Sequence, residues 1–268
     1  MKNLKRVYAV FIRQVFLLRG NPIRLVNIFL WLSVDLLLWG FISRYLDTLG
    51  KATFSFATVL LGAVILNEFL TRVQQGVMTT FLEDVWSRNF LNFFASPLKI
   101  KEYVGGMVVS SIFTSAAGFS VMIMIAGLGF GFNILRIGFY LLPFLIILFL
   151  FGATLGILAI SIILRFGPSA EWIGWPIPFA LSPFMGIFYP VSALPHALQA
   201  VARAIPASYV FEGMRKILMT GHFSNDLVPM LLVGSGLALI YLVLMYLIFF
   251  KVYRYVLKNG LIGRFGAE

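Results

Sequence analysis

The sequence contains no cysteine and only two histidines, His196 and His222, among its 268 residues. It can therefore form no disulfide bond, no thiolate metal site and no cysteine nucleophile. Both histidines fall in one segment that we expect to be a loop, so a histidine-rich metal centre among apolar helices is excluded. We predict no metal site and no catalytic residue.

Sequence motifs of several enzyme classes are also missing. The chain has no Gly-x-x-x-x-Gly-Lys-Ser/Thr loop, no Gly-x-Ser-x-Gly elbow and no His-Glu-x-x-His pair. It cannot bind ATP through a phosphate-binding loop of that type. Any energy from ATP must therefore come from another polypeptide, and we predict that this chain is not an enzyme.

Charge is scarce and apolar residues are abundant, at 12% and 60% of the chain, with a mean hydropathy of +0.96. A bilayer core about 30 Å thick requires about 20 helical residues. Six apolar runs approach that length: Leu25 to Ile42, Phe54 to Leu70, Val104 to Ala126, Gly138 to Leu164, Ile173 to Val191 and Leu227 to Phe250. Strand-like alternation is absent, so we predict an all-α, multi-pass membrane protein with six transmembrane helices.

The net charge of +11 would suit a nucleic-acid-binding protein, but the placement of the basic residues indicates a membrane topology instead. Lysine and arginine concentrate before the first run and after the second, fourth and sixth runs. The positive-inside rule therefore places both termini in the cytoplasm. The first run starts late and no Ala-x-Ala-like site follows it, so we expect no cleaved signal peptide.

Residues 1–24 alternate basic and apolar positions at helical spacing, which predicts an amphipathic helix lying on the inner leaflet. It would serve as an orientation anchor attracted to anionic lipid, or as a contact with another subunit.

The longest inner loop, Arg72 to Lys101, contains a second amphipathic pattern. Its apolar side would carry Phe81, Val85, Trp86, Phe90, Phe93 and Phe94. On the other side, Asp84 and Arg88 are spaced for an i,i+4 ion pair, and Pro97 ends the helix. Such a helix would either dock on a cytoplasmic partner or only shield the bundle from water.

The segment after the fifth run is too apolar for an ordinary loop, and prolines 190, 195 and 206 interrupt it. Two amphipathic pieces, Leu194 to Ile205 and Ala207 to Thr220, predict half-helices that enter the outer leaflet and return. Such a re-entrant element would line a pathway, or it would merely cap the bundle.

Asp35 lies in the middle of the first run, with Trp31 and Trp39 four residues away on either side. A charge at mid-membrane is costly, so this face could line a substrate path or make an interhelical hydrogen bond. An ion- or proton-coupled carrier that uses Asp35 is the alternative function. Glu68 has Arg72 at i+4 as a local partner.

Two further segments carry a family resemblance, namely Asn92-Phe-Phe-Ala-Ser-Pro-Leu-Lys99 with Glu102-Tyr-Val-Gly-Gly106, and Leu194-Pro-His-Ala-Leu198 with Ala204-Ile-Pro-Ala-Ser-Tyr-Val-Phe-Glu-Gly-Met-Arg215. With the basic N-terminus and six apolar runs, they make the whole chain resemble the permease subunit of type-2 ABC exporters. Members of this group export polysaccharides, lipid-linked glycans and drugs.

The resemblance implies a permease in a bacterial or archaeal plasma membrane. A second permease chain, identical or similar, would complete the path, and two cytoplasmic ABC ATPase subunits would carry ATP and Mg. A glycan, a lipid-linked sugar or a hydrophobic drug would move outward by alternating access, without nucleic acid as a partner. The ATPase-coupling residues would be Phe81, Glu83, Asp84, Val85, Trp86, Arg88, Phe90, Phe93, Phe94 and Pro97. The outer gate would include Pro206, Tyr209, Glu212 and Arg215.

We therefore expect one transmembrane permease domain over residues 1–268. Its parts are an interfacial helix (1–24), spans one to five (25–191), an outer re-entrant segment (192–226), span six (227–250) and a cytoplasmic tail (251–268).

Overall fold

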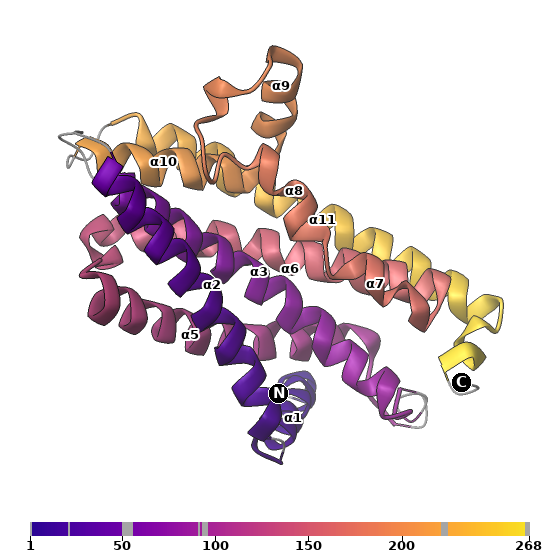
Figure 1. The fold of residues 1–268 in the computed structure, drawn as a ribbon. Coiled ribbons are helices and arrows are strands. Elements are labelled where there is room, and N and C mark those ends of the chain that lie inside the picture. Colours follow the sequence, from indigo (N-terminus) through magenta and orange to yellow (C-terminus); the bar gives the residue numbers. More distant parts are fainter. Residues whose placement is uncertain are drawn as a thin grey trace.

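The computed structural model describes residues 2–20, 22–49, 56–90, 92, 96–220 and 225–265. Helices dominate this part of the chain, which contains no strand, so the predicted all-α class is confirmed. The longest helices are α1 (Lys2–Gly20), α2 (Pro22–Leu49), α3 (Phe56–Trp86), α5 (Ile100–Phe130), α6 (Leu141–Phe166) and α11 (Leu227–Lys258). Figure 1 shows α2, α3, α5, α6 and α11 running along the bundle, with α1 at one end.

Four segments of the described chain are long and apolar enough to cross a membrane, judged by length and composition. They are Phe29–Leu46 in α2, Ile100–Phe130, Ile134–Phe166 and Leu227–Lys258. The third of these segments comprises the 3-10 helix η1 (Ile134–Tyr140) and helix α6, which follows it directly. Helix α3 is as long as α5, but it carries Glu68, Arg72 and a pair of glutamines around its middle. The predicted multi-pass membrane protein is thus supported through four of its six spans.

The predicted fifth span, Ile173 to Val191, is not one continuous helix. The chain passes through η2 (Pro168–Ala170), α7 (Glu171–Gly174), α8 (Ile177–Leu181), η3 (Ser182–Phe184) and η4 (Val191–Ala193). Pro176, Pro178 and Pro183 explain the interruptions, because proline has no backbone N–H and clashes with the preceding helical turn.

The predicted half-helices of the next segment are present as α9 (His196–Ala204) and α10 (Pro206–Thr220). Helix α9 stands out from the body of the bundle in Figure 1. The re-entry of this segment into the outer leaflet stays a prediction.

Helices α3 and α6 form the centre of the bundle. A Cβ atom on Gly152 of α6 would lie 2.8 Å from the carbonyl oxygen of Leu70, and one on Gly156 would lie 2.7 Å from the Cβ atom of Val77. The absence of side chains at these two positions lets the helices approach closely, as small residues do in membrane bundles.

Both terminal segments lie at the same end of the bundle. There α1 packs against the start of α5, and the 3-10 helix η5 (Leu261–Phe265), which follows α11, packs its Phe265 ring against Phe81 and Phe90. Most of the described part of the predicted tail is thus helical, since α11 continues to Lys258 and η5 follows it. We call this the terminal end and the other the α10 end (Figure 1).

Candidate functional site

The predicted coupling segment begins as a direct continuation of α3, which remains helical through Trp86. The backbone then turns over residues 87–90, where Arg88 has a positive φ of 55°. The carbonyl oxygen of Asp84 accepts hydrogen bonds from the amides of Asn89 (2.9 Å) and Phe90 (3.0 Å), which closes the turn. Residues 91 and 93–95 lie outside the described chain, so the predictions for Phe93 and Phe94 do too.

Asp84 is fully buried at this turn, and its carboxylate joins three helices. Arg13 of α1 donates to one oxygen, and the hydroxyl of Tyr103 on α5 donates to the other at 2.6 Å. Charge-assisted bonds of this kind are among the stronger hydrogen bonds in proteins. Helix α3 ends at Trp86, before Arg88, so the pairing of Asp84 with Arg88 at i,i+4 stays a prediction.

A second ion pair fastens α1 to α5. Arg6 donates to both carboxylate oxygens of Glu102, at 3.2 and 3.3 Å. Glu102 also accepts a hydrogen bond from the backbone N–H of Lys99 at 2.8 Å, which caps the first turn of α5. Burial lowers the pKa of the Arg13 guanidinium from its ordinary value, although the nearby Glu83 opposes this shift. The two arginines hold α1 against the rest of the terminal end.

Half of the predicted coupling side chains that the structure describes are internal. Phe81, Val85 and Phe90 are buried, and Phe81 and Phe90 form an edge-to-face pair with ring centroids 5.1 Å apart. Their apolar side faces the protein interior, so it is not available to a partner. The exposed predicted residues are Trp86, Arg88 and Pro97, and Glu83 is half-buried.

The three residues of the candidate pathway in α2 have different surroundings. Trp31 is 64% exposed, whereas Trp39 stacks on Phe188 with ring centroids 4.7 Å apart. Asp35 is half-buried and interacts electrostatically with Arg72 of α3. Arg72 lies 3.9 Å from Glu68, which confirms their predicted local pairing. The three acidic and basic groups thus form one cluster between α2 and α3.

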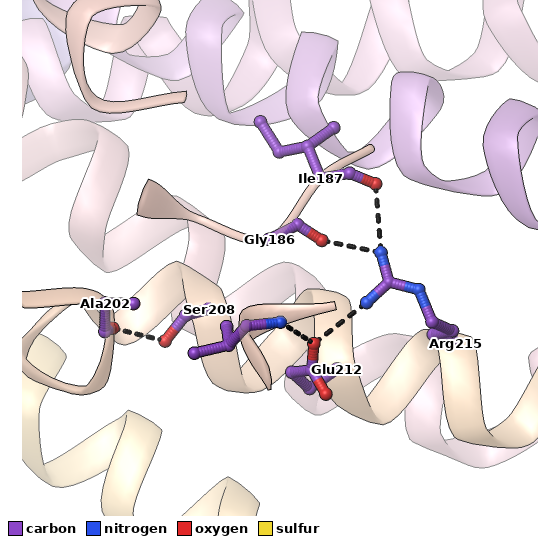
Figure 2. A network of polar contacts seen from close by, with 7 residues as sticks. Gly186, Ile187, Ala202, Ser208, Glu212 and Arg215 are labelled. Atoms are coloured by element: carbon purple, nitrogen blue, oxygen red, sulfur yellow. Dashed lines mark hydrogen bonds and ion pairs between the residues drawn. The ribbon is translucent and has the colours of Figure 1, made fainter. Parts of the chain in front are cut away.

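At the α10 end, Glu212 and Arg215 hold the loop that leads to η4 (Figure 2). Arg215 donates to Glu212 at 2.9 Å and to the carbonyl oxygens of Gly186 and Ile187 at 2.7 and 3.2 Å. Glu212 also accepts the backbone N–H of Val191 at 2.9 Å. Burial lowers the pKa of Arg215 from its ordinary value, and the carboxylate of Glu212 opposes this shift.

The other two predicted gate residues lie on the first turns of the same helix. Pro206 is buried at the start of α10, where its missing N–H is tolerated. The hydroxyl of Tyr209 donates to the carbonyl oxygen of Arg203 in α9 at 2.8 Å. All four predicted residues are therefore brought together on α10, where Tyr209 contacts α9 and the Glu212–Arg215 pair holds the loop.

Sequence reasoning missed the structural importance of Arg6, Arg13 and Tyr103. Glu102 could have been found, because an acidic residue three positions after a helix start is a capping signal. The contact between Arg13 and Asp84 joins positions 71 residues apart, and no local pattern indicates such a pair.

No group of three histidine, cysteine, aspartate or glutamate residues that could hold a metal ion occurs in the described ranges. The site therefore consists of ion pairs, hydrogen bonds and aromatic contacts that position helices.

No curated protein matches the chain at a significant level. The profile of the family described as "ABC-2 type transporter" matches residues 4–219, which is most of the chain and includes α1, the turn at residues 87–90 and α10. This chain thus belongs to the ABC-2 type transporter family, as a permease component of an ABC transporter.

Proposed function

We propose that the protein exports a glycan, a lipid-linked sugar or a hydrophobic drug by alternating access, driven by ATP hydrolysis in a separate cytoplasmic ABC ATPase. Family membership supports this proposal, because permeases of this family generally work with such an ATPase. ATP and Mg would bind to the partner. Two permease chains and two ATPase subunits would form the exporter in the plasma membrane.

In this proposal α3 and the broken segment from α7 to η3 also cross the membrane, which restores six spans and cytoplasmic termini. Two contacts support a crossing by the broken segment. Trp86 at the terminal end donates to Glu171 of α7 at 3.0 Å, whereas Phe188, shortly after η3, stacks on Trp39 of α2. The short helices thus lie between two separated parts of the bundle.

The attachment of α1 is the observation that carries the proposal. Ion pairs to Asp84 and Glu102 fix the ends of α3 and α5 around the turn at residues 87–90, while Trp86 beside it stays 53% exposed. A rigid, partly aromatic turn is suited to transmit the movement of an ATPase subunit, because aromatic side chains often dominate protein interfaces. ATP binding to the partner would then shift the permease between its inward-open and outward-open states.

The first test is affinity purification of the tagged chain from its native membrane, followed by identification of co-purifying chains and of vanadate-sensitive ATP hydrolysis. We expect a stoichiometric ATPase subunit.

The variant Trp86→Ala should weaken the association of this ATPase with the permease at least about tenfold, as for an interface hot spot.

Phe139→Ala provides the matched control, because Phe139 is 82% exposed and lies in η1, away from the turn. It should retain the ATPase. Since Trp86 also donates a hydrogen bond to Glu171, the variant Glu171→Ala, which removes that acceptor, separates loss of this contact from loss of the partner surface. Reproducible absence of an ATPase with the intact, folded chain would overturn the proposal.

A further inference from the structure

A cavity of about 470 Å³ lies among α1, α2, α3 and α5, with Trp175 after α7 completing its wall. Its volume is within the range of about 300–1,000 Å³ that small-molecule sites occupy. Trp31 and Arg72 also line it, so it adjoins the charged cluster between α2 and α3. None of the residues assigned to the outer gate contributes to its wall.

One face of α3 gives the cavity a polar track. The lining positions lie on one helical face, where each is three or four residues from another: Arg72, Gln75, Gly76, Thr79, Thr80, Glu83 and Trp86. With a rise of about 1.5 Å per residue, this face extends about 21 Å along the helix. Polar side chains along a helix in an apolar bundle usually face a partner or a watery path.

The hydroxyl groups of the track are arranged to accept hydrogen bonds. Those of Thr79 and Thr80 donate to backbone carbonyl oxygens in α3, at 2.7 and 2.8 Å. On α5, the hydroxyl of Ser110 donates to the carbonyl oxygen of Gly106 at 2.8 Å. Since each hydroxyl has one proton and two lone pairs, these groups retain lone pairs for a ligand that donates.

Two side chains carry buried donor atoms that make no hydrogen bond to the described residues. Gln14 of α1 is only 4% exposed, and its Nε2 has no hydrogen-bond partner among the described residues. The Nε atom of Arg72 is likewise buried without a hydrogen bond, since the Glu68 carboxylate oxygen that it faces in the ion pair is 3.9 Å away, beyond hydrogen-bond distance. Buried polar atoms are rarely left unsatisfied, so both indicate a ligand group that accepts.

Aromatic rings complete the lining. Three of the five tryptophans of the chain, Trp31, Trp86 and Trp175, face this cavity. Tryptophan offers a large flat apolar surface beside polar groups, which suits a ligand with both kinds of face.

We propose that this cavity binds the neutral, hydroxyl-rich headgroup of an amphiphile, that is, a sugar-like head with an apolar tail. A hydroxyl group both donates and accepts, so such a head can use the lone pairs of the track and the protons of Gln14 and Arg72 together. The charges of the cavity lining already have partners of opposite sign within the protein, Glu68 for Arg72 and Arg13 for Glu83, so a neutral head fits this lining better than a charged one. This inference rests on the proposed export function and selects a lipid-linked sugar among its three substrate classes.

The test compares three probes with the same short alkyl tail: an alkyl glucoside, an alkyl trimethylammonium and an alkyl phosphate. The full chain is extracted into polymer nanodiscs without glycoside detergent, and saturable changes in tryptophan emission are followed below the micellar concentration of each probe. We expect saturable binding of the glucoside alone.

Two variants locate the binding. Gln14→Leu and Thr80→Val should each weaken glucoside binding about fivefold to tenfold, as for the loss of a hydrogen bond. Thr154→Val is the matched control, because Thr154 is also buried and donates to a carbonyl oxygen four residues back at 2.8 Å, but lies on α6 outside the cavity lining.

Preferential binding of either charged probe, no saturable binding, or equal effects of Thr80→Val and Thr154→Val would overturn the inference. Because the readout requires neither the ATPase nor transport, each of these results is independent of the association experiment. An ATPase that still co-purifies would then leave the proposed function intact.

Discussion

Asp84 shows how single residues join the terminal end of the bundle. Its carboxylate has no exposure to solvent, and its two oxygens accept from Arg13 on α1 and Tyr103 on α5. A buried carboxylate of this kind requires its charged partner, because without it the negative charge keeps the hydrogen bond from Tyr103 but loses the opposite charge of Arg13.

Arg13→Gln should therefore destabilise the protein. We expect a loss of about 2–3 kcal/mol, somewhat below the value for a fully buried pair because the Arg13 side chain is 29% exposed. Thermal unfolding of the purified chain at constant lipid and detergent concentration measures the change.

Arg19→Gln removes the same charge from the same helix at an exposed position, so it should change stability by less than about 0.5 kcal/mol. Equal effects of the two variants would show that the charge of α1, rather than the bond to Asp84, determines stability.

Helix packing at the element scale depends on small residues. The glycines of α6 allow α3 to approach so closely that a methyl group on Gly152 would meet the carbonyl oxygen of Leu70 at 2.8 Å and the Cβ atom of Val73 at 2.9 Å. Backbone atoms cannot move aside as the end of a flexible side chain can, so the helices would have to separate.

Gly152→Ala should thus lower stability by about 1–3 kcal/mol, the usual cost of overpacking. Gly236→Ala is the control, since Gly236 lies inside α11 with nothing within 4 Å of the added methyl group. It should be neutral or stabilise by up to about 1 kcal/mol, because alanine favours helix more than glycine does. Unfolding midpoints in detergent compare the two, and a loss for Gly236→Ala as large as for Gly152→Ala would contradict this account of the packing.

The sequence predicted those elements whose apolar length or periodicity is strong. The four apolar spans, the two helices around Pro206 and the N-terminal helix were predictable, because each depends on neighbours within the same segment. The break between α7 and η3 was not predicted, although Pro176, Pro178 and Pro183 were visible, because single prolines are tolerated in membrane helices. Burial of Phe81 and Phe90 was missed, since an amphipathic pattern does not say which surface its apolar side meets.

At the scale of the whole molecule, the distribution of lysine and arginine predicts how the chain is oriented in the membrane. The basic loops and both terminal segments gather at one end, and α9 and α10 lie near the other (Figure 1). The absence of cysteine makes this arrangement directly testable, because any thiol introduced is the only one in the chain.

Single substitutions Ser87→Cys and Arg203→Cys place that thiol at exposed positions on opposite ends. In right-side-out membrane vesicles, an impermeant maleimide should label Arg203→Cys and leave Ser87→Cys unlabelled. Inside-out vesicles should reverse the result. Labelling of both variants from one side would contradict cytoplasmic termini and the proposed six spans.

The two attachments of the loop that follows η3 differ in strength. The Trp39–Phe188 stack joins it to α2, and such an aromatic pair contributes about 0.5–1.5 kcal/mol. Arg215 and Glu212 join it to α10 through several hydrogen bonds that involve charged groups, each about 1.5–3 kcal/mol. If the α10 end opens, the contact between α2 and this loop should therefore break first. The loop should then move together with α10.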